Sequence, residues 1–271
     1  MHLSVNHTTR YEFSEPVVRG LQRLRLRPKS TQGQQVLEWK MLLEGACEEV
    51  DYEDQHHNST ALVSVEPGVS TVTVTCSGKV NTADNSGIIG RHSGHMPLWA
   101  FLSQTPLTKP GPRMRALASS IDSKEDGKLD ALHELSRQVL AEVRYEIGRT
   151  EVDTPAEEAM EAGHGVCQDH THIFLGAARL LGIPARYVSG YLMMDDRIDQ
   201  EAGHGWAEAF VDGLGWVGFD VSNGICPDAR YVRVATGCDY REAAPVTGIS
   251  YGPGESVLAV SLAVEQHLSE Q

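Results

Sequence analysis

Hydrophobic and polar positions alternate along much of the first eighty residues, which is the period of a strand with one buried face. Leu24 and Leu26 fall on one side of an extended segment, whereas Arg23, Arg25 and Arg27 fall on the other. We therefore expect a half-exposed strand here, with the three arginines on its outer face.

A second segment with the same period is rich in β-branched residues, which favour strands. Within Thr71–Cys76, Val72 and Val74 share one face with Cys76. We expect Cys76 to be a core residue of a β-rich N-terminal unit.

The period changes after a stretch rich in glycine and proline that ends near Pro112. Apolar residues then recur at intervals of three and four between Gly127 and Gly148, which predicts an amphipathic helix. The glycine- and proline-rich stretch before it is typical of a connection between two units.

Two further helices are expected. The segment Thr154–Glu157 has the pattern of a capping box with proline at the first helical position, so a short helix should begin there and end near Gly163. The next apolar stripe begins at Cys167 and ends before Gly182.

The rest of the chain has the pattern of strands. Their expected ranges are 186–192, 205–211, 216–221 and 257–264. Helices followed by antiparallel strands are typical of an α+β fold. We expect a β-rich N-terminal domain over residues 1–95, a connection over 96–125, and an α+β core over 126–271 that includes the last strand.

The chain of 271 residues has 23 Lys and Arg against 37 Asp and Glu, a formal net charge of −14 with neutral histidines. This charge repels phosphate backbones and anionic lipids, so we expect no nucleic-acid or membrane partner. No apolar run approaches the ~20 residues that span a bilayer, and the first residues lack the pattern of a signal peptide. We therefore expect a soluble cytoplasmic protein.

Five cysteines, an odd number without a C-x-x-C pair, argue against a disulfide framework and leave room for one reactive thiol. Cys167 follows a glycine-bearing turn at a predicted helix N-terminus, where free N–H groups and the helix dipole favour a thiolate. Those N–H groups can also donate to an oxyanion. The other four, Cys47, Cys76, Cys226 and Cys238, have no such setting.

A partner for this thiol is expected in the sheet. His204 begins one strand of a predicted hairpin, and Asp220 ends the other. A carboxylate beside the imidazole would fix its tautomer and stabilise its charged form. A regular two-residue turn at Gly213-Leu214 would put His204 and Asp220 on opposite faces, so the hypothesis requires an odd-length, bulged connection.

A metal site is the alternative for this region, since His164, Cys167 and His170 recur at intervals of three with His172 nearby. Zinc accepts such ligands, but a closed structural site needs a second Cys or His pair that the segment lacks. We therefore expect no metal and no cofactor, and His170 and His172 should either support the site or be ordinary packing or surface residues.

Four segments in this order and spacing resemble the bacterial transglutaminase-like superfamily. They are Gly165–Asp169, Gly182–Tyr191, His204–Trp206 and Gly215–Asp220. The resemblance covers roughly residues 125–250, and the β-rich region before it is similar to the N-terminal domain of these bacterial proteins. It implies a papain-like fold for the core.

The same resemblance places the catalytic positions on Cys167, His204 and Asp220. The chain departs from the family twice. It has Gly205 where the family usually has Ala in His-Ala-Trp, and Val221-Ser222-Asn223 where the family usually has Pro-Thr-Asn. Neither change removes a reacting group.

These residues predict an acyl-transfer enzyme that acts on peptide or carboxamide bonds through a thioester. We favour hydrolysis, with a peptide or protein as substrate, because nothing marks an amine site. A true transglutaminase, in which an amine accepts the acyl group, is the alternative. From another class, a non-catalytic peptide-binding module on the same scaffold is the second alternative.

Overall fold

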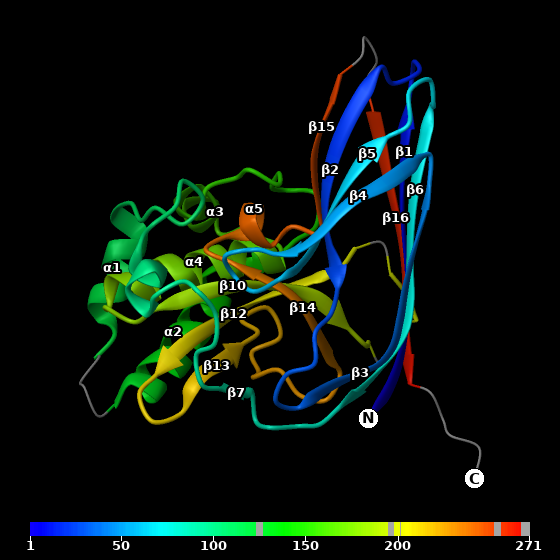
Figure 1. Ribbon diagram of the computed structural model, residues 1–271. Coiled ribbons are helices and arrows are strands. Elements are labelled where there is room, and N and C mark those ends of the chain that lie inside the picture. Colours follow the sequence, from blue (N-terminus) through cyan, green and yellow to red (C-terminus); the bar gives the residue numbers. More distant parts are fainter. Residues whose placement is uncertain (123–126, 195–197, 201, 252–255, 267–271) are drawn as a thin grey trace.

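The computed structural model describes residues 1–122, 127–194, 198–200, 202–251 and 256–266. The strands form a β-sandwich and a separate central sheet, and the helices gather on the side of the central sheet away from the sandwich (Figure 1). This is the expected α+β architecture with a β-rich N-terminal region. None of the described helices has both the length and the apolar character to cross a membrane.

The sandwich consists of two antiparallel sheets. Sheet A has the order β11-β16-β1-β6-β3 and contains β1 (His2–Phe13), β3 (Gln34–Glu44), β6 (Thr71–Thr82), β11 (Asp199–Gln200) and β16 (Ser256–Gln266). Sheet B has the order β15-β2-β5-β4 and contains β2 (Arg19–Arg27), β4 (Ala46–Glu53), β5 (Ser59–Val65) and β15 (Val246–Tyr251). Cys76 is fully buried between the sheets with Leu24 and Leu26, which confirms its expected place in the core.

Arg25 contradicts the expected outer face of β2. Its side chain is buried, and its Nε donates to Asp54 Oδ2 at 2.9 Å. The register between β2 and β5 shifts between Leu24 and Arg27, so the alternation of the strand is interrupted at this point. A bulge of this kind turns a side chain away from the face that its position predicts.

The central sheet, sheet C, has the order β14-β10-β12-β13-β7. It contains β7 (Ile88–Gly90), β10 (Ala185–Leu192), β12 (His204–Val211), β13 (Gly215–Phe219) and β14 (Tyr231–Gly237). The helices are η1 (Leu98–Leu102), α1 (Pro112–Ser120), α2 (Lys128–Glu142), α3 (Ala156–Ala162), α4 (Cys167–Leu180) and α5 (Tyr240–Ala243). Helix α4 packs against β12 and is covered by α1, α2 and α3, so it is buried from Asp169 to Arg179.

The two ends of the chain belong to one unit. β16 pairs with β1, and β15 pairs with β2, so the strand expected to complete the core lies instead in the sandwich. Conversely, β7 lies within the first 95 residues, which we expected to form the N-terminal domain, but it pairs with β13 of the central sheet. A period of two indicates that a strand has a buried face but not which sheet it joins.

Two helices differ in detail from their predictions. Helix α2 ends at Glu142 rather than near Gly148, because the chain continues as a short strand, β8 (Arg144–Tyr145), parallel to β9 (His164–Gly165). Helix α3 has Pro155 as its N-cap and no side-chain cap. The capping-box prediction is therefore wrong, and Thr154 Oγ1 instead accepts from the N–H of Glu151 at 2.8 Å.

Candidate active site

Cys167 is the first residue of α4, as the sequence predicts, and it is half-buried. Asp169 Oδ2 accepts hydrogen bonds from the N–H of Val166 at 2.8 Å and from Thr150 Oγ1 at 2.7 Å. A Cβ on Gly165 would lie 2.7 Å from this carboxylate, so only glycine allows the close approach. Asp169 thus fixes the turn that carries Cys167, where the first helical N–H groups lack intrahelical acceptors.

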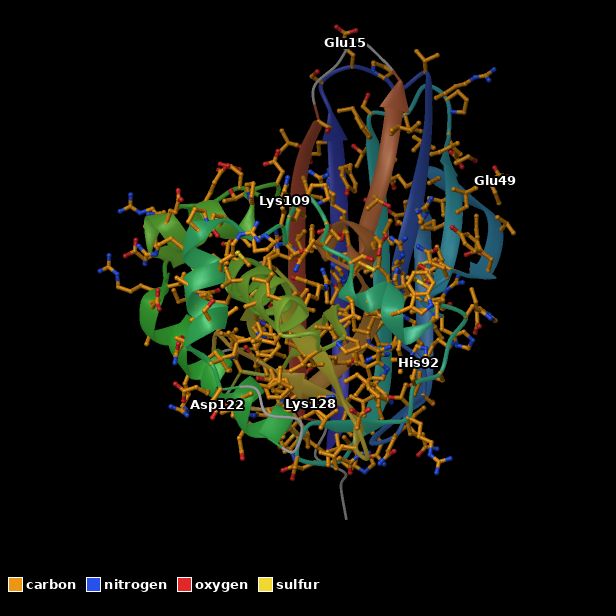
Figure 2. The ribbon with its side chains drawn as sticks, turned by 90° about the vertical axis from the view of Figure 1, so that its left-hand side faces the viewer. Glu15, Glu49, His92, Lys109, Asp122 and Lys128 are labelled. Atoms are coloured by element: carbon orange, nitrogen blue, oxygen red, sulfur yellow. The ribbon has the colours of Figure 1, made fainter. Side chains whose placement is uncertain are left out.

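The hairpin of β12 and β13 has the odd-length connection that the hypothesis requires. Val211 pairs with Gly215, so three residues join the strands, and Gly213 and Gly215 adopt φ values of +83° and +88°. Lys128, labelled in Figure 2, donates from the first turn of α2 to Asp212 Oδ2 in this connection at 2.8 Å. The glycines and this ion pair hold the register of the hairpin.

That register places the imidazole and the carboxylate on one face. Ala207 pairs with Phe219, so one step further Trp206 faces Asp220. His204 lies two residues before Trp206 and therefore points to the same side as Asp220. The result is a hydrogen bond of 2.6 Å between His204 Nε2 and Asp220 Oδ2.

Asp220 receives more donors than the sequence analysis named. Its Oδ2 also accepts from the hydroxyl of Tyr231 at 2.6 Å and from Asn223 Nδ2 at 2.7 Å. Burial opposes ionisation, but the hydrogen bonds from His204, Tyr231 and Asn223 hold the pKa of Asp220 below its ordinary value. The carboxylate therefore stays charged and fixed in orientation.

His204 links this carboxylate to the thiol. Its side chain also interacts with that of Cys167, and because Nε2 is bonded to Asp220, Nδ1 is the nitrogen left to face the sulfur. Burial disfavours the charged ring, but the bonds to Asp220 and Cys167 outweigh it and raise the pKa of His204 to about 10. The imidazole of His204 thus lies between the Asp220 carboxylate and the side chain of Cys167 at the start of α4.

The two histidines inside α4 support the fold of the site and do not join this chain of contacts. His170 Nε2 lies 2.9 Å from the carbonyl oxygen of Val143, and its Nδ1 lies 2.8 Å from Ser222 Oγ. His172 Nε2 accepts from the N–H of Tyr240 at 3.1 Å, and burial lowers the pKa of His172 to about 3. His172 is therefore neutral, and His170 connects α4 to the loop that follows Asp220.

Gly205, the first departure from the family pattern, has a steric explanation. A Cβ at this position would lie 2.1 Å from the hydroxyl oxygen of Tyr187 on the neighbouring strand. Burial, and then the charge of Cys167, raise the pKa of Tyr187 above its ordinary value. A tyrosine close to the thiol therefore occupies the space that an alanine methyl group would need.

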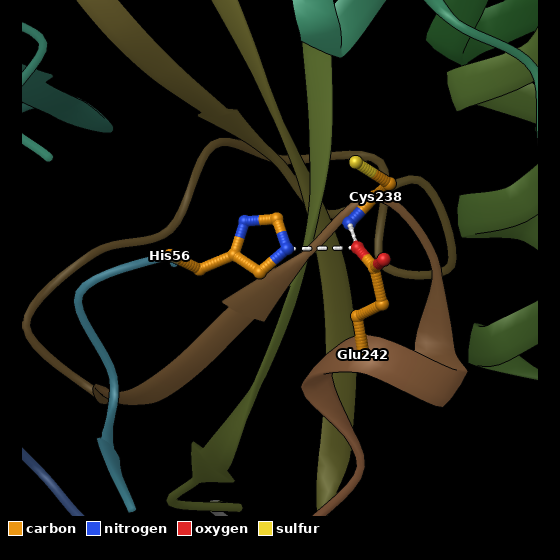
Figure 3. A group of neighbouring side chains, drawn as sticks. All are labelled: His56, Cys238 and Glu242. Atoms are coloured by element: carbon orange, nitrogen blue, oxygen red, sulfur yellow. Dashed lines mark hydrogen bonds and ion pairs between the residues drawn. The ribbon is translucent and has the colours of Figure 1, made fainter. Parts of the chain in front are cut away.

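Among the described residues, a group that could hold a metal ion occurs away from Cys167, at His56, Cys238 and Glu242 (Figure 3). Glu242 Oε2 already accepts from His56 Nε2 and from the N–H of Cys238, each at 2.8 Å. Arg179 lies within electrostatic reach of Cys238 and Glu242, and its positive charge opposes a cation. We interpret the group as a tie between the β4–β5 loop and α5.

Three residues near the reacting groups were not found from the sequence. Asn223 could have been found, because it follows Asp220 in the segment that the family resemblance covers. Tyr231 and Tyr187 carry no local signal, since their roles depend on strand pairings that bring them beside His204 and Gly205.

Comparisons with known proteins bear on the family and the fold. A sequence profile of the transglutaminase-like superfamily matches residues 115–221, and one of the bacterial transglutaminase-like N-terminal region matches residues 3–81. An uncharacterized protein of Mycobacterium leprae is 26% identical over 95% of this chain and 96% of its own length. An uncharacterized protein of Mycobacterium tuberculosis is 26% identical over 96% of this chain and 91% of its own.

Among solved structures, that of a candidate cysteine protease from Cytophaga hutchinsonii superposes with a TM-score of 0.74 at 20% identity. The superposition covers 99% of this chain and 92% of that one, so the two share a fold across both units. Residues 115–221 thus match the transglutaminase-like superfamily and residues 3–81 match its bacterial N-terminal region, which confirms the resemblance seen in the sequence.

Proposed function

We propose that the protein is a cysteine hydrolase that cleaves peptide or carboxamide bonds through a thioester on Cys167. The observation that carries the proposal is the continuous chain of contacts from Cys167 to His204 to Asp220, ending in a buried, multiply bonded carboxylate. A binding module would have no need for an imidazole that bonds a carboxylate and a thiol at the same time.

In the first half of the reaction the Cys167 thiolate attacks the substrate carbonyl carbon, and the carbonyl oxygen becomes an oxyanion. The N–H of Cys167 at the start of α4 is the first donor for it. The imidazolium of His204 then gives its Nδ1 proton to the leaving amine as the C–N bond breaks. Asp220 keeps Nε2 protonated, so the ring ends this step neutral.

In the second half the neutral imidazole takes a proton from water as the water oxygen attacks the thioester. The C–S bond breaks, an acid is released, and the proton on His204 restores the ion pair with the thiolate. We favour water over an amine as acceptor because no described group near Cys167 marks a site for an amine. The chemistry of the two acceptors otherwise requires the same residues.

Acyl transfer can be tested with p-nitrophenyl acetate, an activated donor that needs no known specificity. We expect an acetyl adduct on Cys167 by mass spectrometry, absent in Cys167→Ser and retained in Cys47→Ser, which removes an exposed thiol. Adding methylamine separates the acceptors, since hydrolysis gives acetate and transamidation gives N-methylacetamide. Release of the amide in excess would favour a transglutaminase, and the absence of any adduct would refute the thioester.

A further inference from the structure

A cavity of about 390 Å³ lies where the β-sandwich meets the central sheet. Strands β1, β2, β15 and β16 line it from the sandwich, and β10 and β14 line it from the core. Its volume is in the range of pockets that bind small ligands, and its walls are mainly tyrosine and aliphatic side chains with a few polar groups. It is therefore large enough for part of a peptide substrate.

This cavity adjoins the reacting groups. Gly203, in its wall, directly precedes His204, and Gly190, also in the wall, pairs with His204 across β10 and β12. Tyr240 lines it as well, and burial together with the charge of Cys167 raises the pKa of this phenol. A substrate held in the cavity would thus extend toward the thiol and the imidazole.

Arg25 brings a buried cation to the cavity wall. Its side chain is 2% exposed, its Nε donates to Asp54, and its Nη1 has no hydrogen-bond partner in the part of the chain that the structure describes. Asp54 is already saturated, because its carboxylate also accepts from the N–H of His56 and from the N–H and side chain of Asn58. A buried donor without an acceptor is costly, so this guanidinium is suited to a ligand that supplies one.

The rest of the wall contains no competing charge. Among the described residues that line the cavity, there is no Asp, Glu or Lys, and burial lowers the pKa of His7 to about 4, so that this histidine is neutral. Arg25 is thus the one permanently charged side chain among the described residues of the wall, and Asp54, which balances its charge, lies outside the wall. With its charge balanced by Asp54, the guanidinium would recognise a carboxylate through its remaining N–H donors.

Resting on the proposed function, we propose that this cavity is the specificity pocket of the enzyme and that Arg25 binds a carboxylate of the peptide substrate. The guanidinium fork matches a carboxylate in geometry as well as in charge. The aliphatic and tyrosine walls would cover the segment between this carboxylate and the scissile bond. The substrate class is then a peptide with an acidic side chain or a free carboxyl end close to the cleaved bond.

Binding can be measured without turnover, by calorimetry on Cys167→Ala with two matched pairs of peptides. Acetyl-Gly-Glu amide against acetyl-Gly-Gln amide tests a side-chain carboxylate, and acetyl-Gly-Ala acid against its amide tests a terminal one. We expect the charged member of at least one pair to bind about tenfold tighter or more, as charge-assisted hydrogen bonds predict. The pair that discriminates identifies the source of the carboxylate.

The variants separate recognition from folding. Arg25→Gln alone would leave Asp54 buried and unpaired, so Arg25→Gln with Asp54→Asn removes both charges together. This double variant should lose the preference for the charged peptide. Arg23→Gln, on the exposed part of the same strand, should keep it. In a version that retains Cys167, an unchanged rate of alkylation by iodoacetamide shows that the double variant still forms the site.

Equal affinity for the charged and neutral members of both pairs, no binding of either member, or a preference that survives in the double variant would each overturn the inference. The proposed function fails by a different result, which is the absence of the acetyl adduct on Cys167. Carboxylate binding without that adduct would support the carboxylate pocket and refute the hydrolase. The adduct without a carboxylate preference would support the hydrolase and refute the carboxylate pocket.

Discussion

Two groups among the described residues combine a histidine and a carboxylate that bond each other with a nearby cysteine, and the two groups differ in their surroundings. In one, His204 bonds Asp220 at 2.6 Å. In the other, His56 bonds Glu242 at 2.8 Å, next to Cys238.

The difference lies in the surroundings of each sulfur. Cys167 is half-buried at the N-terminus of a 14-residue helix, and its side chain interacts with that of His204. Cys238 is buried, and burial raises the pKa of its thiol to about 12, which keeps it protonated. The comparison shows that two groups of similar side chains can place their sulfur in very different surroundings, and helix placement and access are the features that favour a reactive thiol.

The largest expected contrast comes from removing each sulfur. Cys167→Ala should abolish the acetyl adduct and lower acyl-transfer rates by about 10³-fold or more, because the nucleophile is gone. Cys238→Ala should leave the rate within about threefold and cost about 1 kcal/mol of stability as a small buried cavity. Steady-state rates and thermal unfolding of both variants measure this. If Cys238→Ala proved equally inactive while still folded, the assignment of roles would be wrong.

The second largest contrast is expected between substitutions of the two carboxylates, Asp220 and Glu242. Asp220→Asn keeps the shape of the side chain but cannot fix the charged imidazole, so we expect the rate of acyl transfer to fall by about 10²- to 10⁴-fold. Glu242→Gln should leave the rate nearly unchanged and lower the melting temperature, since it weakens the tie between the β4–β5 loop and α5. Kinetic and unfolding measurements on both variants test this. A larger loss of rate in Glu242→Gln than in Asp220→Asn would show that the roles of the two carboxylates have been assigned the wrong way round.

A smaller effect is expected from a substitution that affects the group of Cys167, His204 and Asp220 but not the group of His56, Cys238 and Glu242. Gly205→Ala would place a methyl group 2.1 Å from the Tyr187 hydroxyl, so we expect a loss of about 1–3 kcal/mol in the free energy of unfolding and a slower acylation. Adding Tyr187→Phe should restore part of the stability, though not all, because the ring carbon that bore the hydroxyl is 2.8 Å from the same point. Denaturant titrations of the single and double variants test this, and additive effects would argue against the contact.

The smallest effect is a difference in pH dependence. His204 has a pKa raised from 6.5 to about 10, so its contribution to stability is complete below pH 6.5 and is lost as the pH rises through 10. Glu242 has a pKa lowered from 4.5 to about 2, chiefly by its bond to His56, so its contribution is complete above pH 4.5 and is lost as the pH falls through 2.

The two variants His204→Gln and Glu242→Gln should therefore approach the wild-type melting temperature at opposite ends of the pH range. The deficit of His204→Gln should narrow from pH 7 toward 10, and that of Glu242→Gln should narrow from pH 5 toward 3. Melting curves in a series of buffers measure both deficits. If the difference in melting temperature from the wild type did not depend on pH in either variant, the lost stability would not come from the charged pair.

Much of the site could be predicted from the sequence because it depends on local signals. The glycine turn and apolar stripe place Cys167 at a helix start, and the spacing of His204 and Asp220 around one short connection places them on one face only if that connection is odd. The α+β class follows from the change of period near Pro112 in the same way.

What could not be predicted depends on contacts between distant strands. Arg25 reads as an outer-face residue until the register shift in β2 and the partner Asp54, twenty-nine positions away, are known. Tyr231 reaches Asp220 only because β14 pairs with β10 at the edge of the central sheet. Local periodicity carries no information on either choice of neighbour.

The return of the last strands to the sandwich has a consequence for the order of folding. β1 cannot pair with β16 until that strand has left the ribosome, so until then the β1 edge of sheet A lacks the neighbour that it has in the described fold. The segment from β7 to α5, which carries Cys167, His204 and Asp220, is already synthesised at that moment. The α+β core can therefore form before β15 and β16 complete the sandwich that precedes it in the sequence.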